Sequence, residues 1–411
     1  MMRHGTSAVL IGAGLIALIG FLIGWLRRRF HERSISRDPE KVLIWDLGVK
    51  RPSLWEKFRG SAPDSGRAIA LLEAINRGAE RAADPSLAAA SANSPTSKAD
   101  RIWRPLKDNL RAARHGFLMP TCRIYDHGNL LHDADGIAVV QHWLEAVTAG
   151  SESAEGVGQI SIVGAAGTGK TTFLYALFLK LIGGHPVPML ASADNLQSRP
   201  KQIDNLLTAG DSLPAFVSAW LDNRVIVPHY ARATLIRSFT KALKDGEIIL
   251  ILDGVDKLRR QGLGDFAKDL LGPGKVRFWI ISEQFSNRPG YEFLRPATRI
   301  ELDETWSTDH IAAHIRQRWP RHLAADSRLD THSLTTTRDT FSQVIHDVIK
   351  KHDKTAPPGV EHWLRLPGNL DFFIKSHLQE LTKNGPIDEW EIRRRAESQP
   401  YLLSKLPRQR D

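Results

Sequence analysis

Residues 164–171 of this chain read GAAGTGKT, which fits the pattern G-x-x-x-x-G-K-[ST] of a phosphate-binding loop without a mismatch. Residues 159–163 before it, Gln-Ile-Ser-Ile-Val, predict a short buried strand, and residues 172–180 after it predict the start of a helix. The chemistry needs this order, because a glycine-rich turn points successive backbone N–H groups at phosphate oxygens. The helix adds the positive end of its dipole. The stretch therefore predicts a nucleotide-binding site.

Each residue type in the loop has an expected role. Gly164, Gly167 and Gly169 permit the curled backbone. Lys170 is expected to reach the β- and γ-phosphates and to act in catalysis, and the hydroxyl of Thr171 is expected to hold Mg²⁺. The predicted nucleotide contacts in this stretch are Gly164, Ala165, Ala166, Gly167, Thr168, Gly169, Lys170, Thr171 and Thr172.

A second acid is expected to organise the metal ion and the attacking water. Residues 248–252 are five consecutive apolar residues, typical of a strand buried on both faces, and Asp253 after them is the predicted Mg²⁺ ligand, directly or through water. Asp256 is the predicted catalytic residue that polarises the attacking water, and the alternative is a solvated loop acid. Ser282 follows another predicted strand, residues 276–281, and is predicted to place a polar group near the γ-phosphate.

These strands predict the fold class. Residues 188–191 and 299–302 add two further short strands, and helical segments separate the strands along the chain. Strands that alternate with helices favour an α/β fold with a doubly wound parallel sheet. Ligands bind at the carboxyl ends of such strands, where Asp253 and Ser282 are expected to lie.

The composition is that of an ordinary globular protein of two or three units. The chain has 411 residues, of which 42% are hydrophobic and 25% are charged. Its net charge of +10 is compatible with nucleic acid, anionic lipid or simple solubility, and nucleic acid is the less favoured partner because no recognisable reading module accompanies the charge. Cys122 is the only cysteine, so no internal disulfide can form, which suits a reducing compartment.

The N-terminal segment predicts a membrane anchor. Residues 8–26 form a run of 19 residues without charge or proline, about the length that crosses a hydrocarbon core of ~30 Å as a helix. Trp25 lies at its end, and five arginines follow between residues 27 and 37. A cleaved signal peptide is the alternative. The positive-inside rule predicts a single-pass protein with its N-terminus outside and its C-terminal bulk in the cytoplasm, and the GxxxG step from Gly20 to Gly24 permits self-association.

The order of motifs resembles the NACHT branch of the STAND class of P-loop NTPases, over about residues 158–382. GAAGTGKTT matches the family's Walker A motif, and ILILDGVDKL at 249–258 resembles its Walker B signature, with the small residue after the first Asp that marks this branch. Four weaker segments follow the family's order: VPMLAS at 187–192, RFWIISEQ at 277–284, TRIELDETWSTDHIAAHI at 298–315 and LRLPGNLDFF at 364–373. The resemblance implies a small helical lid after the nucleotide-binding core and places Pro367 near the nucleotide.

Together the patterns divide the chain into five expected segments. These are a transmembrane helix over 8–26, a juxtamembrane region and flexible linker over 27–130, the nucleotide-binding core over 131–305, a helical lid over 306–385 and a basic tail over 386–411. Within and beside the second segment, a short strand is expected over 42–45, and helices are expected over 66–82, 106–117 and 135–149.

Two positions depart from the family pattern. Lys257 stands where the family usually has Glu, and Glu283 with Gln284 stands where it usually has Arg-Pro. Loss of an arginine near the γ-phosphate removes a charge that favours hydrolysis, so slow hydrolysis is expected while nucleotide binding survives. The chain has no Asn-Lys-x-Asp element that would select guanine, so ATP and Mg²⁺ are the expected cofactors.

The sequence therefore favours a membrane-anchored signalling NTPase in which ATP or ADP sets the lid against the core and drives assembly. One alternative is a membrane scaffold that binds ATP without hydrolysing it, motivated by Lys257 and Glu283. Another is an AAA+-like loader that acts on nucleic acid, motivated by the net charge. The expected partners are the membrane, further copies of the chain and a separate sensor or effector protein, since STAND proteins normally carry a sensor region after the lid.

Overall fold

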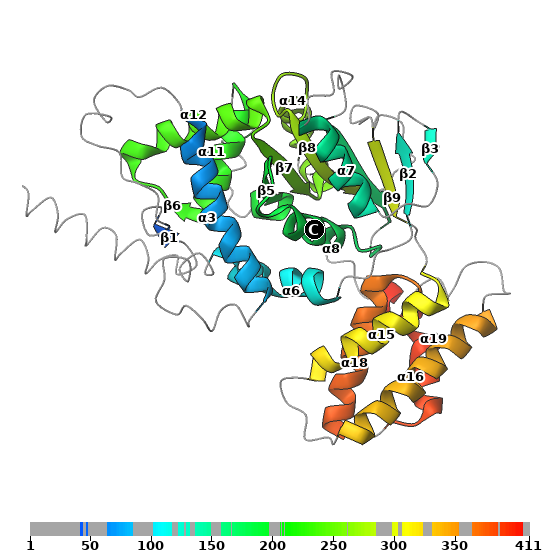
Figure 1. Ribbon diagram of the computed structural model, residues 1–411. Helices are drawn as coiled ribbons and strands as arrows, with labels where there is room; N and C mark the ends of the chain where they lie inside the picture. The colour runs from blue at the N-terminus through cyan, green and yellow to red at the C-terminus, as the bar shows by residue number, and fades with distance from the viewer. Residues whose placement is uncertain are drawn as a thin grey trace, which may run out of the picture.

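The fold is that of a computed structural model of the 411-residue chain (Figure 1). It describes residues 42–43, 47, 64–84, 102–116, 122–126, 129–131, 136–148, 158–165, 167–196, 206, 208, 210–260, 262–284, 298–302, 306–323, 331–352, 364–384 and 387–405. The predicted anchor over 8–26, the predicted flexible linker around 85–100 and Ala166 of the loop lie outside these residues.

A seven-stranded sheet forms the centre of the main domain, in the order β3-β2-β9-β4-β8-β7-β5. The five strands predicted from the sequence are all present and run parallel to one another. Strand β8 lies between the loop strand β4 and strand β7, which ends in Asp253. The strands are β2 Cys122–Asp126, β3 Asn129–Leu131, β4 Gln159–Gly164, β5 Val187–Ser192, β7 Ile248–Asp253, β8 Phe278–Gln284 and β9 Thr298–Leu302.

The sheet is mixed, which corrects the predicted wholly parallel sheet. Strand β2 pairs antiparallel with both β3 and β9. Only residues 127–128 separate β2 from β3, and so short a connection permits only antiparallel pairing, because parallel neighbours need a long crossover. This hairpin was missed in the sequence because its first strand is not a continuous apolar run: Arg123 is exposed between the buried Cys122 and Ile124.

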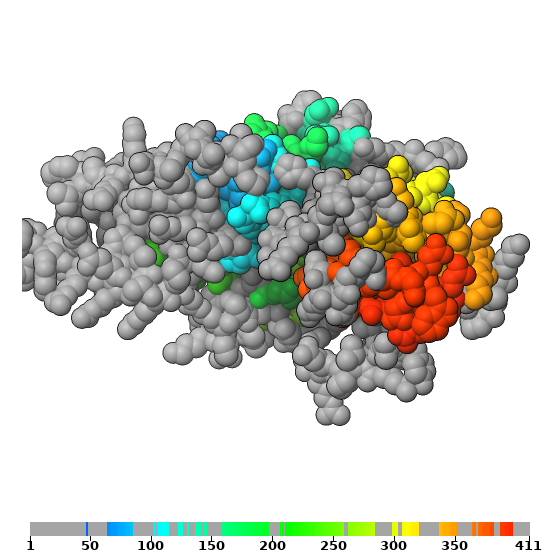
Figure 2. Space-filling view, turned by 90° about the horizontal axis from the view of Figure 1, so that it is seen from below, coloured from blue at the N-terminus to red at the C-terminus, as the bar shows by residue number. Residues whose placement is uncertain are grey.

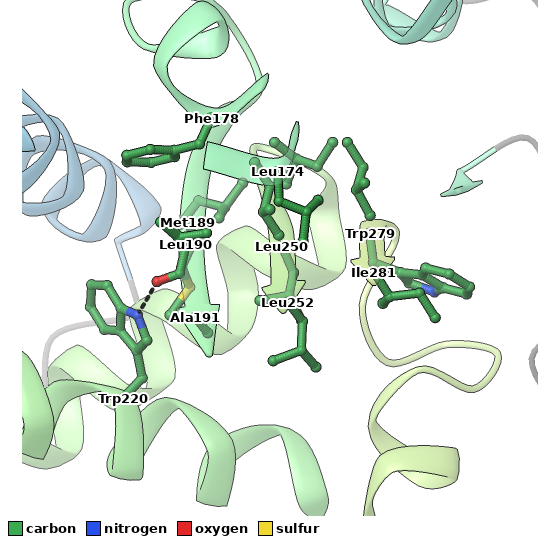
Figure 3. Packing of buried hydrophobic residues seen from close by; sticks show 14 of the residues in the cluster. Leu174, Phe178, Met189, Leu190, Ala191, Trp220, Leu250, Leu252, Trp279 and Ile281 are labelled. Carbon is green, nitrogen blue, oxygen red and sulfur yellow. Dashed lines mark hydrogen bonds between the residues drawn. The ribbon is translucent and has the colours of Figure 1, made fainter. Parts of the chain in front are cut away.

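Burial on both faces explains why the central strands are almost continuously apolar. Every residue of β5 and β7 is buried, and full burial of one large aliphatic side chain is worth roughly 1.5–3 kcal/mol. Figure 3 shows this packing around Leu250 and Leu252 of β7. The indole of Trp220 adds a polar anchor, because its Nε1 donates to the Leu190 carbonyl of β5 at 3.0 Å.

The helices of the main domain surround this sheet. The helix after the loop, α8, contacts β4, β5, β7 and β8, while α12 contacts β7 and α3 contacts β5. A two-stranded parallel ladder, β1 with β6, begins where a strand was expected at residue 42. The elements are β1 Val42–Leu43, α3 Ser65–Ala83, η3 Arg104–Leu106, α6 Lys107–Gly116, α7 Gly136–Thr148, α8 Lys170–Leu181, α9 Ala193–Leu196, α11 Ser212–Arg224, β6 Val225–Ile226, α12 His229–Asp245, α13 Val255–Arg260 and α14 Gly264–Leu270.

The core of this domain extends N-terminal to residue 131. Helices α3 and α6, which the sequence predicted closely, belong to the same hydrophobic cluster as the sheet. Two buried hydrogen bonds fix α3 in place: Asn76 Nδ2 donates to the Pro188 carbonyl of β5 at 2.9 Å, and Trp103 Nε1 donates to the Ile75 carbonyl at 2.7 Å. The segment before the predicted core boundary therefore contributes α3, which packs on β5, and α6, which packs on α3 and α8.

Among the described residues C-terminal to the sheet, four helices form a second hydrophobic core, which we call the lid (Figures 1 and 2). It takes in the last of these helices, which lies in the predicted tail 386–411, beyond the lid predicted over 306–385. Figure 2 shows them, yellow to red, at one end of the molecule. Rings fill the centre of the lid: Phe341 lies 5.2 Å from Trp319, 5.5 Å from Phe373 and 4.7 Å from His377, measured between ring centroids. The helices are α15 Thr308–Leu323, α16 Thr331–His352, α18 Pro367–Asn384 and α19 Glu389–Lys405.

In the described ranges, no helix is both long enough and apolar enough to cross a bilayer. The longest, α16 with 22 residues, carries charged side chains along its length, among them Arg338, Asp347 and Lys350. Charges at the bilayer centre are costly, which excludes such a helix from spanning. On this finding we correct the two predictions of a fold class with a preceding transmembrane helix and of a single-pass membrane location. The predicted segment itself, 8–26, lies outside the described residues.

Candidate functional site

The predicted loop is the turn that joins β4 to α8. Gly167 and Gly169 have φ angles of +86° and +93°, a conformation that residues with a side chain rarely adopt. A Cβ at Gly164 would lie 2.7 Å from the Oγ1 of Thr168, so glycine is required there as well. The hydroxyl of Thr168 is fully buried and donates to the Ala165 carbonyl at 2.9 Å, which holds the loop from within. The glycines are thus explained by local geometry.

The ammonium of Lys170 lies over the same loop. Its Nζ donates to the carbonyls of Gly164 and Ala165, each at 2.7 Å. Burial lowers the pKa of Lys170 below its ordinary value, and the nearby carboxylates of Asp256 and Asp253 oppose this by raising it. One ammonium and two carboxylates therefore share the space beside the loop.

Thr171 and Asp253 meet although 82 residues separate them in sequence. The Thr171 hydroxyl donates to both carboxylate oxygens, at 3.2 Å to Oδ1 and 3.0 Å to Oδ2. Asp253 is 8% exposed and ends the buried strand β7, as predicted. A hydroxyl and a carboxylate are the hard oxygen donors that Mg²⁺ prefers. The residues present therefore fit the cofactor that the loop implies.

Asp256 lies in the first turn of the short helix α13, directly after the turn that follows Asp253. It is 8% exposed, which argues against the alternative of a solvated loop acid. Its electrostatic effect on the pKa of Lys170 is the largest among the carboxylates. Asp256 is thus a buried acid whose charge acts on the loop lysine.

Ser282 is buried at the end of β8, 1% exposed, and it contacts Asp253. Its Oγ donates to Asp253 Oδ1 at 2.5 Å and accepts from the Gly254 N–H at 2.8 Å. The sequence predicted that Ser282 would face the nucleotide. The structure shows its hydroxyl hydrogen-bonded within the protein, to the acid that ends β7.

Glu283 and Lys257, the two residues that differ from the NACHT pattern, make their contacts away from Asp253. Glu283 is the neighbour of Ser282 in a strand, so its side chain lies on the opposite face of the sheet. There it accepts a hydrogen bond from the buried Ser161 Oγ of β4 at 2.7 Å. Lys257 forms an exposed ion pair with Asp194 of α9, between the end of β5 and α13. Neither contact was foreseen, because each depends on which strands lie side by side.

The lid meets the loop at the start of α18. Pro367 is the first residue of that helix, a position that suits proline, and Leu366 precedes it. The Leu366 Cβ is 3.9 Å from the point where a Cβ on Gly167 would lie. The Arg365 carbonyl accepts from the Trp306 N–H at 3.1 Å, and Arg365 donates back to the Trp306 carbonyl at 3.2 Å. The segment before α18 therefore contacts the loop through Leu366 and the segment before α15 through the hydrogen bonds between Arg365 and Trp306.

Of the other predicted contacts, Thr172 lies half-buried in the first turn of α8. Among described residues, no group of three or more His, Cys, Asp or Glu side chains could hold a metal ion by itself.

Comparison with known proteins gives remote similarity only. No family model matches the chain, and no curated protein matches it. Similar solved structures include PCH-2 of C. elegans, with 13% identity and a TM-score of 0.34 over 63% of this chain and 74% of that chain. Another is the RuvB Holliday junction branch migration motor of Thermotoga maritima, with 13% identity and a TM-score of 0.23 over 66% of this chain and 87% of that chain. Similarity this remote does not assign a family, so the site is interpreted from its own geometry.

Proposed function

We propose that this chain binds ATP with Mg²⁺ at the loop between β4 and α8 and hydrolyses it slowly. In this proposal it is a switch of the NACHT/STAND type, in which the bound nucleotide sets the lid against the main domain and promotes self-association. The observation that carries the proposal is the hydrogen bond between Thr171 and Asp253, with Lys170 and Asp256 beside it. Binding of ATP with Mg²⁺ needs both a loop that binds the phosphates and a carboxylate that holds the metal.

Binding follows from groups that the loop already presents. The first-turn N–H groups of α8 and the dipole of that helix favour an anion in front of Gly169. The Lys170 ammonium now donates to two loop carbonyls, and a phosphate oxygen is a stronger acceptor that would draw it forward. The Leu366 side chain at the loop gives the lid a place from which to contact the same ligand.

Hydrolysis would be shared between the protein and the metal. Bound Mg²⁺ supplies charge that neutralises the phosphate oxygens, and Thr171 and Asp253 would hold it. Asp256 is the group that would accept a proton from the attacking water, because it is buried beside Lys170. Residue 283 is a glutamate that contacts Ser161, and β8 contains no arginine that could stabilise developing charge, which supports slow turnover.

The test is ATP binding and turnover by the full chain and four variants. Lys170→Ala should weaken ATP binding at least tenfold, whereas Lys180→Ala, an exposed lysine in the last turn of the same helix, should not. Asp256→Asn should lower turnover about 100-fold with little change in ATP affinity, whereas Asp265→Asn, an exposed acid in the first turn of α14, should leave both unchanged. Equal ATP affinity in the wild type and Lys170→Ala would refute the proposal.

A second candidate function is a scaffold that binds ATP without hydrolysing it. It is favoured by Lys257, which stands in the α13 turn after Asp256 where the family has an acid. The same assay separates the two, because a scaffold binds ATP with Lys170-dependent affinity and shows no turnover above the Lys170→Ala background. Analytical ultracentrifugation with ATP, with ADP and without nucleotide tests the switch, and identical sedimentation in all three would exclude nucleotide-driven assembly.

A further inference from the structure

The hydroxyl of Ser282 is fully used inside the protein. It is 1% exposed, it donates to Asp253 Oδ1 at 2.5 Å and it accepts from the Gly254 N–H at 2.8 Å. A serine hydroxyl has one proton to give, and this one goes to the carboxylate. A direct hydrogen bond from Ser282 to a phosphate would break that contact.

We propose that Ser282 is a positioning residue for the metal site, which acts by holding the Asp253 carboxylate and the turn after it. This inference rests on the proposed binding of ATP with Mg²⁺. It replaces the expectation that Ser282 contacts the nucleotide.

The strand order makes this role possible. Because β8 lies between β4 and β7, its last residues stand next to both the loop and the acid. The register pairs Leu252 with Ile281, so Asp253 and Ser282 are the next neighbours on the two strands. Their side chains point to the same face of the sheet, since neighbouring strands keep their alternation in register.

The hydrogen bonds assign the two carboxylate oxygens different tasks. Oδ1 accepts from Ser282 at 2.5 Å and more weakly from Thr171 at 3.2 Å, whereas Oδ2 accepts only from Thr171 among the contacts described. The hydrogen bond to Oδ1 restricts rotation of the carboxylate about its Cβ–Cγ bond. Oδ2, which has no contact with Ser282, would then be the oxygen that holds Mg²⁺ together with Thr171.

The contact with Gly254 extends the effect beyond Asp253. Its N–H donates to the Ser282 oxygen, and a hydroxyl that accepts one hydrogen bond donates another more strongly. Gly254 has a φ of +78° and leads into α13, which carries Asp256. One hydroxyl therefore holds the metal-binding acid and the first residue of the turn that leads to the proposed base.

The test measures ATP affinity twice for each protein, with excess Mg²⁺ and with EDTA, using a fluorescent ATP analogue and the full chain. The dissociation constant in EDTA divided by that with Mg²⁺ gives the factor by which the metal strengthens ATP binding. In Ser282→Ala this ratio should fall about tenfold, as for other residues that orient metal ligands, while affinity in EDTA stays within about twofold of the wild type. Ser282→Thr, which keeps the hydroxyl, should restore the ratio.

Ser161→Ala is the matched control, because Ser161 is also 1% exposed and also donates one hydrogen bond to a carboxylate, on the opposite face. It should leave both affinities unchanged. If Ser282→Ala fails to fold in a urea titration, Ser282→Cys, which has a weaker donor of similar size, enters the same assay, where the ratio should again fall.

Two results would overturn the inference. Equal loss of affinity with Mg²⁺ and with EDTA would make Ser282 a nucleotide contact or a purely structural residue, and an unchanged ratio would show that its hydrogen bond to Asp253 has no role at the metal. Failure of the proposed function gives a different result, since the wild type would then bind ATP no better than Lys170→Ala under either condition.

Discussion

His377 makes the lid sensitive to acid. Its ring is 1% exposed in the core of the lid, beside Trp319 of α15 and Phe341 of α16, and Arg395 of α19 adds a positive charge nearby. Burial first, and Arg395 second, lower the pKa of His377 from 6.5 to about 4. Both ring nitrogens lack a hydrogen-bond partner among the described residues, so nothing there stabilises a second proton.

The sign of the effect follows from which state binds the proton first. As pH falls below about 6.5, the unfolded chain takes up a proton at His377 while the folded lid does not. The unfolded state is thereby stabilised relative to the folded state, and the free energy of unfolding falls. The full loss of unfolding free energy, reached below pH 4, is roughly 3 kcal/mol, since each pKa unit is worth about 1.4 kcal/mol. Between pH 7.5 and pH 5 the linkage relation gives a loss of about 2 kcal/mol, or about 30-fold in the opening equilibrium.

Hydrogen exchange with mass spectrometry can localise this loss to peptides of α16 and α18, after correction for intrinsic exchange. The opening free energy of those peptides should fall by about 2 kcal/mol from pH 7.5 to pH 5 in excess of the fall in His377→Leu. Subtracting the fall in His377→Leu removes the contribution of the carboxylates to the pH dependence, because they titrate in both proteins. His346→Leu, an exposed histidine on α16, should keep the wild-type profile. A difference between wild type and His377→Leu that is flat across this range would refute the reasoning.

Three further substitutions, two of them paired with a control substitution, test the fold. Gly246→Ala should lower the unfolding free energy, measured by urea titration, by about 3 kcal/mol, because φ is +79° and the new Cβ would lie 2.5 Å from an aromatic carbon of β8. Its control, Gly274→Ala, has a similar φ of +75° but no atom within 4 Å of the new Cβ, and it should lower the unfolding free energy by only about 1 kcal/mol. Trp220→Phe should cost about 1–2 kcal/mol through its lost hydrogen bond to β5, and Trp390→Phe, 68% exposed, should cost under about 0.5 kcal/mol. Lys257→Met should change stability by less than about 1 kcal/mol in chemical denaturation, since its ion pair is exposed.

The parallel strands were predictable because burial on both faces leaves a plain signal. A run such as residues 248–252, closed by an acid, has few other interpretations, and the glycine pattern at 164–169 fixes the neighbouring strand. The hairpin of β2 and β3 was not predictable in this way, because its strands are short and one face carries charged side chains such as Arg123. Helices α3 and α6 were predicted, but the docking of α3 on β5 was not, since it depends on contacts such as that of Asn76.

The site shows the same division between local and nonlocal information. That Asp253 and Ser282 lie at one edge follows from the rule that parallel strands end together, but that they touch follows from strand order, which the sequence does not state. The strand period of two then separates Ser282 from Glu283, although they are adjacent in sequence. The residue at position 283 can therefore change without altering the contact of Ser282 with Asp253, because the two side chains lie on opposite faces of the sheet.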